Sequence, residues 1–308
     1  MKSRVMFAIS LFHSIGLLAQ NPQTTTSANS AAPTSTSAAP VTPIPARTTA
    51  TTNALPVMTT TTTTPESAST AKKLTLVLGM EYSQPLAKDE KSDLENSMDL
   101  VFAPSYKLND RFTLVGKVAL SKQLYGVQDT LVSDTELGLS IKGAKINERW
   151  STLHSIAGVL PTSEKSQQVN KLKGAVAVNN GIAFSKNILT VKYVLGLSRS
   201  VHEYEQNING EFMNEYGIKN TLDVKIQATD KLTASLVGIY RTAITYVNTP
   251  RYAFELHGDL GYDFTQQLSA SVGLSNDGNA LAANGIDSNI SLYNEDTSYW
   301  RAGLSYVY

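Results

Sequence analysis

From Leu74 to its last residue the sequence alternates between apolar and polar side chains, and this pattern constrains the fold more than any other feature. In the final segment, Trp300, Leu304 and Tyr306 share one parity, and Arg301 has the other. A period of two is that of a β-strand, because successive side chains point to opposite faces. Each alternating segment therefore predicts a strand with one apolar and one polar face.

Twelve such segments follow one another. They are 74–83, 98–108, 112–123, 131–142, 150–160, 176–184, 189–198, 216–227, 232–241, 252–264, 268–275 and 299–308. The fourth places Leu131 on the same face as Leu137 and Leu139, whereas the alternation in 150–160 is too weak to show which face is apolar. The chain is therefore predicted to be all-β.

The connections between these segments are of two kinds. Short ones lie at 109–110, 143–148, 185–187, 229–230 and 265–267. Those between them, near 84–97, 125–130, 161–173, 199–214, 244–250 and 275–298, are mostly longer and more polar. Short turns at one end and long loops at the other are typical of antiparallel transmembrane barrels, and an even strand number leaves both termini at the short-turn end. Closure is required there, because every backbone polar group in hydrocarbon needs an internal partner.

The closing strand carries a further signal. Trp300, Leu304, Tyr306 and Tyr308 share a face, so the chain ends on an aromatic residue inside its own pattern. This strand resembles the last strand of Gram-negative outer-membrane β-barrels, in which a terminal Phe is commoner than Tyr. The resemblance implies that these four residues form the signal read by the barrel-assembly machinery. It covers residues 72–308 and indicates no subfamily.

The composition excludes several other kinds of site and partner. The chain has 26 basic and 26 acidic side chains, so no net charge attracts nucleic acid. It has no cysteine, which rules out disulfides and thiolate metal sites. Beyond the N-terminus no apolar run reaches the roughly 18 residues of a transmembrane helix. If the chain spans a membrane, it does so with strands.

The N-terminal part predicts export. Residues 1–19 place Lys2 and Arg4 before an apolar run, as in a cleaved signal peptide, with an uncleaved anchor as the alternative. Residues 20–71 consist mostly of Thr, Ser, Ala and Pro and predict a disordered periplasmic linker. The alternatives for the linker are entry into the barrel lumen or contact with the cell wall or a partner. Residues 72–308 then form a barrel in the outer membrane, with both termini in the periplasm.

In such a barrel the apolar faces contact lipid, aromatic residues gather at the membrane interfaces, and the polar faces line the lumen. The expected interface aromatics are Phe112, Trp150, Phe184, Tyr262, Phe264, Trp300 and Tyr306. The expected lumen-lining residues are Glu81, Asp99, Lys117, Asp134, Glu136, Lys192, Lys219, Asp223, Lys225, Arg241, Glu255, His257, Asp259 and Arg301. Because both signs are present, the lining fits either a narrow, weakly selective channel or a closed barrel stiffened by salt bridges.

Two other classes compete with a channel. A secreted soluble β-domain would also have regular short strands, but it would bury its apolar faces in one large core. An outer-membrane lipid hydrolase needs a Ser beside a His on the lipid face. His257 has lumen parity, His202 is expected in a loop, and His154 is expected near Leu137 with no Ser in position. No catalytic residue is therefore predicted.

The last long loop contains Asp277, Asp287, Glu295 and Asp296, which together suggest a divalent cation bound to lipopolysaccharide. Loop acids are usually only solvated, so no metal or cofactor site is predicted. The expected partners are outer-membrane lipid and lipopolysaccharide, the assembly machinery and small hydrophilic solutes, without nucleic acid. The sequence thus predicts a porin-like passive channel, with a closed structural barrel or an adhesin or receptor barrel that binds through its outer loops as the alternative.

Overall fold

The computed structural model describes residues 73–86, 96–124, 130–281 and 287–308. The predicted signal peptide, residues 1–19, and the predicted linker, residues 20–71, lie outside the described residues. The strands are β1 (Leu74–Pro85), β2 (Ser97–Lys107), β3 (Phe112–Gln123), β4 (Thr130–Val132), β5 (Thr135–Ile141), β6 (Trp150–Leu160), β7 (Leu172–Lys186), β8 (Leu189–His202), β9 (Asn214–Gln227), β10 (Leu232–Thr245), β11 (Pro250–Asp263), β12 (Leu268–Asn279) and β13 (Ser298–Val307). A short π-helical turn, η2 (Lys165–Val169), lies between β6 and β7.

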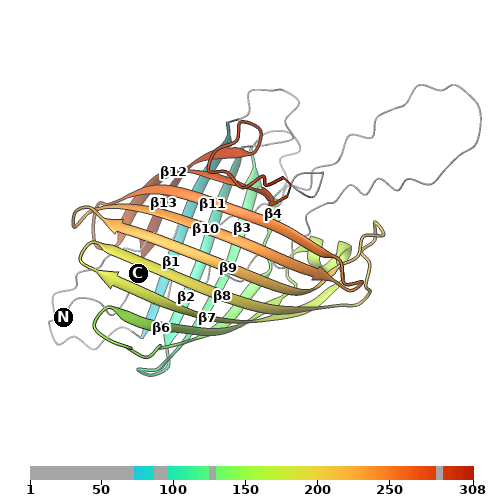
Figure 1. Ribbon diagram of the computed structural model, residues 1–308, viewed down its shortest axis with the longest axis horizontal. Coiled ribbons are helices and arrows are strands. Elements are labelled where there is room, and N and C mark those ends of the chain that lie inside the picture. Colours follow the sequence, from blue (N-terminus) through green and yellow to red (C-terminus); the bar gives the residue numbers. More distant parts are fainter. Residues whose placement is uncertain (1–72, 87–95, 125–129, 282–286) are drawn as a thin grey trace, which may run out of the picture.

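These strands form one closed antiparallel barrel (Figure 1). β1 pairs with both β2 and β13, and β2 also pairs with β3, so no free edge remains. β4 and β5 both pair with β3 and share one place, so the thirteen strands occupy twelve positions. The predicted twelve-stranded antiparallel barrel is confirmed.

Four of the five short turns are closed by the same hydrogen bonds. In each, the side-chain oxygen of an Asn or Thr accepts the backbone N–H of the first residue of the next strand. These residues are Asn109, Asn147, Thr229 and Thr265. The fifth turn, between β7 and β8, has Asn187 at φ 51°, a left-handed conformation that Asn tolerates better than most residues. Local side-chain chemistry therefore fixes the hairpin register at this end.

The outward face of the barrel is apolar. Leu78, Phe102, Leu137, Leu222 and Leu260 are each 44–55% exposed. Facing inward on the same strands are buried polar and charged side chains. This distribution is the reverse of a soluble β-domain, and it suits a wall surrounded by lipid. In the described part of the chain, no helix has the length and apolar character needed to span a bilayer.

The fourth barrel position contains an irregularity. Val132 pairs with Leu120 and Glu136 pairs with Lys117, so one extra residue is inserted between β4 and β5. The hydroxyl of Ser133 accepts the N–H of Ala119 at 2.8 Å and stabilises this bulge. An extra residue reverses the parity of the side chains. Leu131 therefore lies opposite the inward-facing Ser121, and the prediction that it shares a face with Leu137 is wrong.

Candidate functional site

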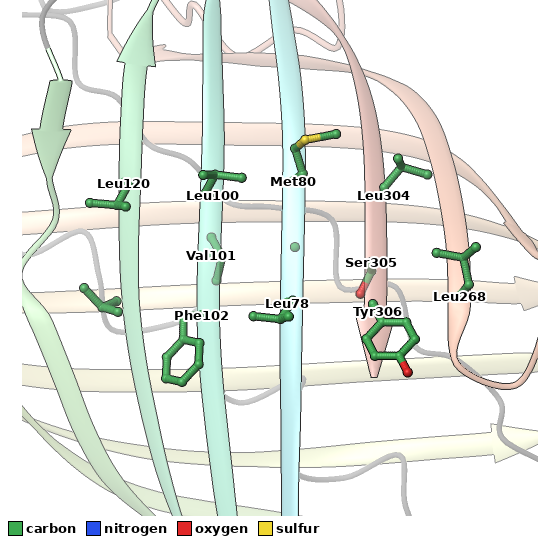
Figure 2. Close-up of a pocket in the computed structure, with 12 residues that line it drawn as sticks. Leu78, Met80, Leu100, Val101, Phe102, Leu120, Leu268, Leu304, Ser305 and Tyr306 are labelled. Atoms are coloured by element: carbon green, nitrogen blue, oxygen red, sulfur yellow. The ribbon is translucent and has the colours of Figure 1, made fainter. Parts of the chain in front are cut away.

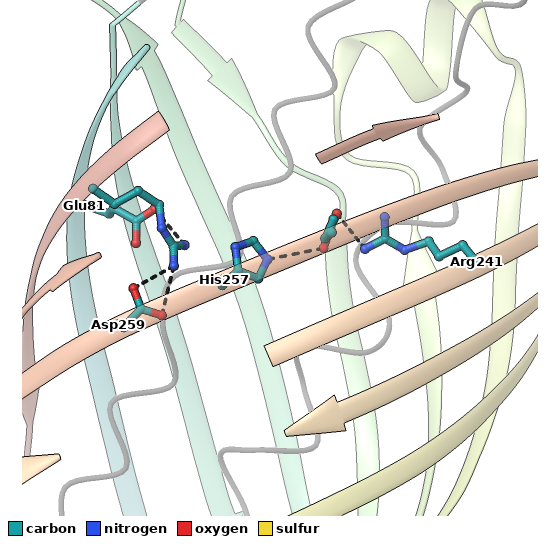
Figure 3. A network of polar contacts seen from close by, with 6 residues as sticks. Glu81, Arg241, His257 and Asp259 are labelled. Atoms are coloured by element: carbon teal, nitrogen blue, oxygen red, sulfur yellow. Dashed lines mark hydrogen bonds and ion pairs between the residues drawn. The ribbon is translucent and has the colours of Figure 1, made fainter. Parts of the chain in front are cut away.

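Arg301 contacts two carboxylates, those of Glu81 and Asp259, on the inside of the barrel wall (Figure 3). Its guanidinium nitrogen Nη2 donates to both carboxylate oxygens of Asp259, at 2.8 and 3.1 Å, and Nη1 lies 3.5 Å from Oε1 of Glu81. The three side chains are at most 5% exposed. A planar guanidinium with several donors is suited to holding two carboxylates at once. The cluster joins β1, β11 and β13 on the inside of the wall.

A glycine makes this contact possible. In the register of β11, β12 and β13, Gly273 lies between Asp259 and Arg301. A Cβ atom at position 273 would collide with the carboxylate of Asp259, so the missing side chain leaves the space in which that carboxylate lies. The ion pair across β12 therefore depends on a residue with no charge of its own.

A second group lies farther along β11. Oε1 of Glu255 is 2.6 Å from Nη2 of Arg241 on β10, and Oε2 is 3.6 Å from Nε2 of His257. Glu255 and His257 are 1% and 5% exposed, and His257 lies between Glu255 and Asp259 along the strand. Figure 3 shows both groups as one line of charged side chains from Glu81 to Arg241.

Lysine residues occupy other parts of the interior. Lys192 on β8 lies 3.3 Å from the carboxylate of Asp223 on β9, and Lys117 on β3 is directly opposite Glu136 on β5. Lys219 on β9 is 3% exposed and interacts electrostatically with both Glu136 and Glu255. Because β5 and β11 are far apart around the barrel, this lysine couples charges from separate parts of the wall.

The remaining residues of the predicted lumen set are distributed as follows. Asp99 is fully buried on β2, opposite Glu81 and Ser121, and Lys225 is buried on β9. Asp134 differs from the rest of the set because it lies in the break between β4 and β5. Its carboxylate accepts the N–H of Ser163 at 2.9 Å and the hydroxyl of Ser166 at 2.5 Å. It therefore anchors the β6–β7 connection at the long-loop rim.

That rim also contains a half-buried lysine. Burial lowers the pKa of Lys165 in η2, and the charge of Glu211 in the β8–β9 connection acts to raise it. The two connections touch, since the N–H of Ile208 donates to the carbonyl of Val169. His202, predicted to lie in a loop, is instead the last residue of β8, and its ring contacts that of Tyr246.

One part of the interior escaped the sequence analysis. Leu153, Ala157, Val159, Ala175 and Ala177 are at most 7% exposed and face inward from β6 and β7. Small and branched apolar residues on the inner face of β6 hide the alternation in 150–160, which is why neither face could be assigned. The interior therefore has one charged side and one largely apolar side.

Comparison with solved structures identifies the fold. The barrel is similar to the NanC porin, with a TM-score of 0.51 and 10% identity over 75% of this chain and 98% of that one. It is also similar to an outer-membrane channel from Pseudomonas putida F1, with a TM-score of 0.52 and 12% identity over 80% and 99% of the two chains. The chain has the fold of an outer-membrane porin. No protein-family model matches its sequence, and no curated protein matches it.

The predicted interface aromatics lie near the ends of this barrel. At the short-turn end, the rings of Trp150 and Phe184 are 5.0 Å apart, and Tyr262 lies beside Phe264. At the long-loop end, Trp300 packs edge-on against Tyr82 and donates its indole N–H to Gln84. The other two, Phe112 and Tyr306, are at the start of β3 and the end of β13.

A polar cluster interrupts the outer surface of the barrel. Nε2 of His154 is 2.9 Å from the hydroxyl of Thr152, and Nδ1 is 2.8 Å from Oδ1 of Asn180 on β7. His154 pairs with Ile141, so its predicted position near Leu137 is wrong; the β5–β6 turn is centred nearer to β6 than expected.

A hydroxyl, an imidazole and an amide in this order resemble a nucleophile, a base and an orienting group. However, the hydroxyl of Thr152 also accepts the N–H of Ala144, and the N–H of Thr152 donates to the Ala144 carbonyl. Neither of these two N–H groups is therefore free to stabilise an oxyanion. The geometry assigns no catalytic residue here.

The acidic residues of the last long loop do not gather either. Within the described ranges, which include Asp277, Asp287, Glu295 and Asp296, no group of three or more His, Asp or Glu side chains is close enough to hold a metal ion.

Proposed function

We propose that the protein is a passive outer-membrane channel for small hydrophilic solutes. The observation that carries this proposal is the charged interior of a barrel whose outer wall is apolar. Charged side chains along the inner face can form hydrogen bonds with water and polar solutes, which an apolar lining cannot do. The porin fold supports the same function.

The groups around Arg301 and Glu255 form the constriction of this channel. Their side chains project into the barrel and are at most 13% exposed, so they fill most of the cross-section at that height. Acidic and basic groups alternate along it, which disfavours strong selectivity for either sign of ion. The channel is therefore narrow and admits small solutes of either charge.

The location follows from the same proposal. Residues 1–19 direct export, residues 20–71 form a periplasmic linker, and 72–308 span the outer membrane of a Gram-negative bacterium with both termini in the periplasm. Trp300, Leu304, Tyr306 and Tyr308 are the signal for the barrel-assembly machinery. Outer-membrane lipid and lipopolysaccharide surround the aromatic ends of the strands.

Single-channel recording in planar bilayers tests the proposal. The full mature chain should give discrete conductance steps with a reversal potential near zero. Arg301→Ala removes bulk and leaves Glu81 and Asp259 unbalanced, so it should increase the conductance and favour cations. Arg199→Ala, which removes a pair between the largely exposed Arg199 and Glu215 at the rim, is the matched control and should leave both quantities nearly unchanged.

A folded protein that never conducts would contradict the proposal. Folding is checked independently by heat-modifiable migration on gels. Silence from such a barrel would favour the closed structural barrel or one that binds partners through its outer loops.

A further inference from the structure

Most of the outer wall offers lipid a uniformly apolar surface. Across β1, β2, β3, β12 and β13, side chains including Leu78, Met80, Phe102, Leu120 and Leu304 surround a shallow groove of about 380 Å³ (Figure 2). Acyl chains are sufficient to fill such a groove, because most of the side chains that line it are apolar.

The wall formed by β6 to β9 is different. Among the described residues of this wall, Thr152, His154, Asn180 and Asn220 are polar, non-aromatic and face outward, and Thr242 on the neighbouring β10 does so as well. Asn220 accepts the hydroxyl of Tyr193 at 2.7 Å, and His154 contacts both Thr152 and Asn180.

The position of Asn180 makes it costly in a lipid environment. Asn180 and His154 are each four residues from the contacting rings of Phe184 and Trp150. With a rise of about 3.3 Å per residue and a strand tilt of about 40°, both lie about 10 Å inside that ring level. An apolar band is about 25 Å tall, so this depth is near its centre.

The hydrogen bonds within the cluster leave one group unsatisfied. Oδ1 of Asn180 has a contact with His154, but in the described part of the chain the amide nitrogen Nδ2 has no partner, and the residue is exposed. An amide with two free donors costs several kcal/mol in hydrocarbon. A phospholipid headgroup or ester does not reach the centre of the band, so another protein surface is the better partner.

We propose that this wall is the contact surface with a second copy of the chain. Two copies inserted in the same direction are related by a two-fold axis normal to the membrane, so each residue meets residues at its own depth. Asn is self-complementary, because its oxygen has a second lone pair and its nitrogen two protons. Nδ2 of Asn180 can therefore donate to Oδ1 of Asn180 in the partner, and reciprocally. Gly158, outward on β6, has no side chain to hold the walls apart.

Cross-linking in outer membranes tests the contact, and the absence of native cysteine makes single-cysteine variants unambiguous. Val178→Cys is outward-facing, 40% exposed and two residues from Asn180, and it should yield a covalent dimer with a short bis-maleimide. Val272→Cys on β12 is 54% exposed to the other side and serves as the matched control, with little dimer expected. Adding Asn180→Val to Val178→Cys should reduce the dimer several-fold.

Two results would overturn this inference. Equal cross-linking at positions 178 and 272 would indicate random collision, and an unchanged yield with Asn180→Val would remove the polar contact as its cause. If native mass spectrometry instead finds a monomer whose bound phospholipid is lost in Asn180→Val, a lipid covers the wall. Heat-modifiable migration confirms folding, and unchanged conductance of Asn180→Val separates this question from the channel proposal.

Discussion

At the scale of single residues, the charge contacts of the interior depend on where side chains are absent as well as on which residues are charged. Asp259 and Arg301 meet only because Gly273 between them has no side chain, and the interaction buries both ions. Removing one member of such a pair leaves a buried charge without compensation, which costs more than the intact pair contributes. The neutral residue that permits the contact therefore has a strong influence on stability.

Gly273→Ala should accordingly lower the free energy of unfolding by about 1–3 kcal/mol, the usual cost of adding a methyl group where there is no room. Gly258→Ala on β11 is the control, because a Cβ there meets nothing within 4 Å. Urea unfolding of the refolded protein in detergent measures both. Equal losses in the two single variants would contradict the steric explanation.

At the scale of elements, the bulge between β4 and β5 decides the role of Asp134. Because the bulge lies at the long-loop rim, the carboxylate holds Ser163 and Ser166, and through them the connection containing η2. Asp134→Ala should release this connection without opening the barrel.

Limited proteolysis measures that release. Trypsin should cleave after Lys165 much faster in Asp134→Ala than in the unmodified chain, while the heat-modifiable barrel persists. Asp230→Ala, in the short turn between β9 and β10, should leave the rate at Lys165 unchanged. A faster cut in both variants would indicate general loosening instead of a lost anchor.

The same elements show what could be predicted from the sequence. Alternation and turn residues were sufficient for the strands, because both signals are local. The inversion at Leu131 was not predictable, since the adjacent Leu131 and Val132 are both apolar and either could continue the outward face. Thr152 could have been found beside His154, because residues two apart on a strand share a face. The partners of Arg301 depend on register across β1, β11 and β13, which no local pattern contains.

At the scale of the whole molecule, closure depends on the last residues. The N–H of Tyr308 donates to the carbonyl of Leu76 at 2.9 Å, the N–H of Leu76 donates back at 3.2 Å, and Val307 bonds to Gln267. The first two bonds extend the β1–β13 pairing and the third extends the β12–β13 pairing, and without them backbone groups would face lipid unpaired. The side chain of Tyr308 makes no contribution to them, so the main chain and the ring have separable functions.

Two variants separate those functions. Tyr308→Ser keeps the closing backbone bonds and should fold into lipid vesicles as well as the unmodified chain, but it should accumulate poorly in the outer membrane of cells if the ring belongs to the assembly signal. Deletion of 306–308 removes the bonds and should reduce the heat-modifiable form in both settings. Tyr308→Phe, which keeps an aromatic terminus, should behave as the unmodified chain in both. Normal accumulation of Tyr308→Ser in cells would show that assembly reads the closing strand without its terminal ring.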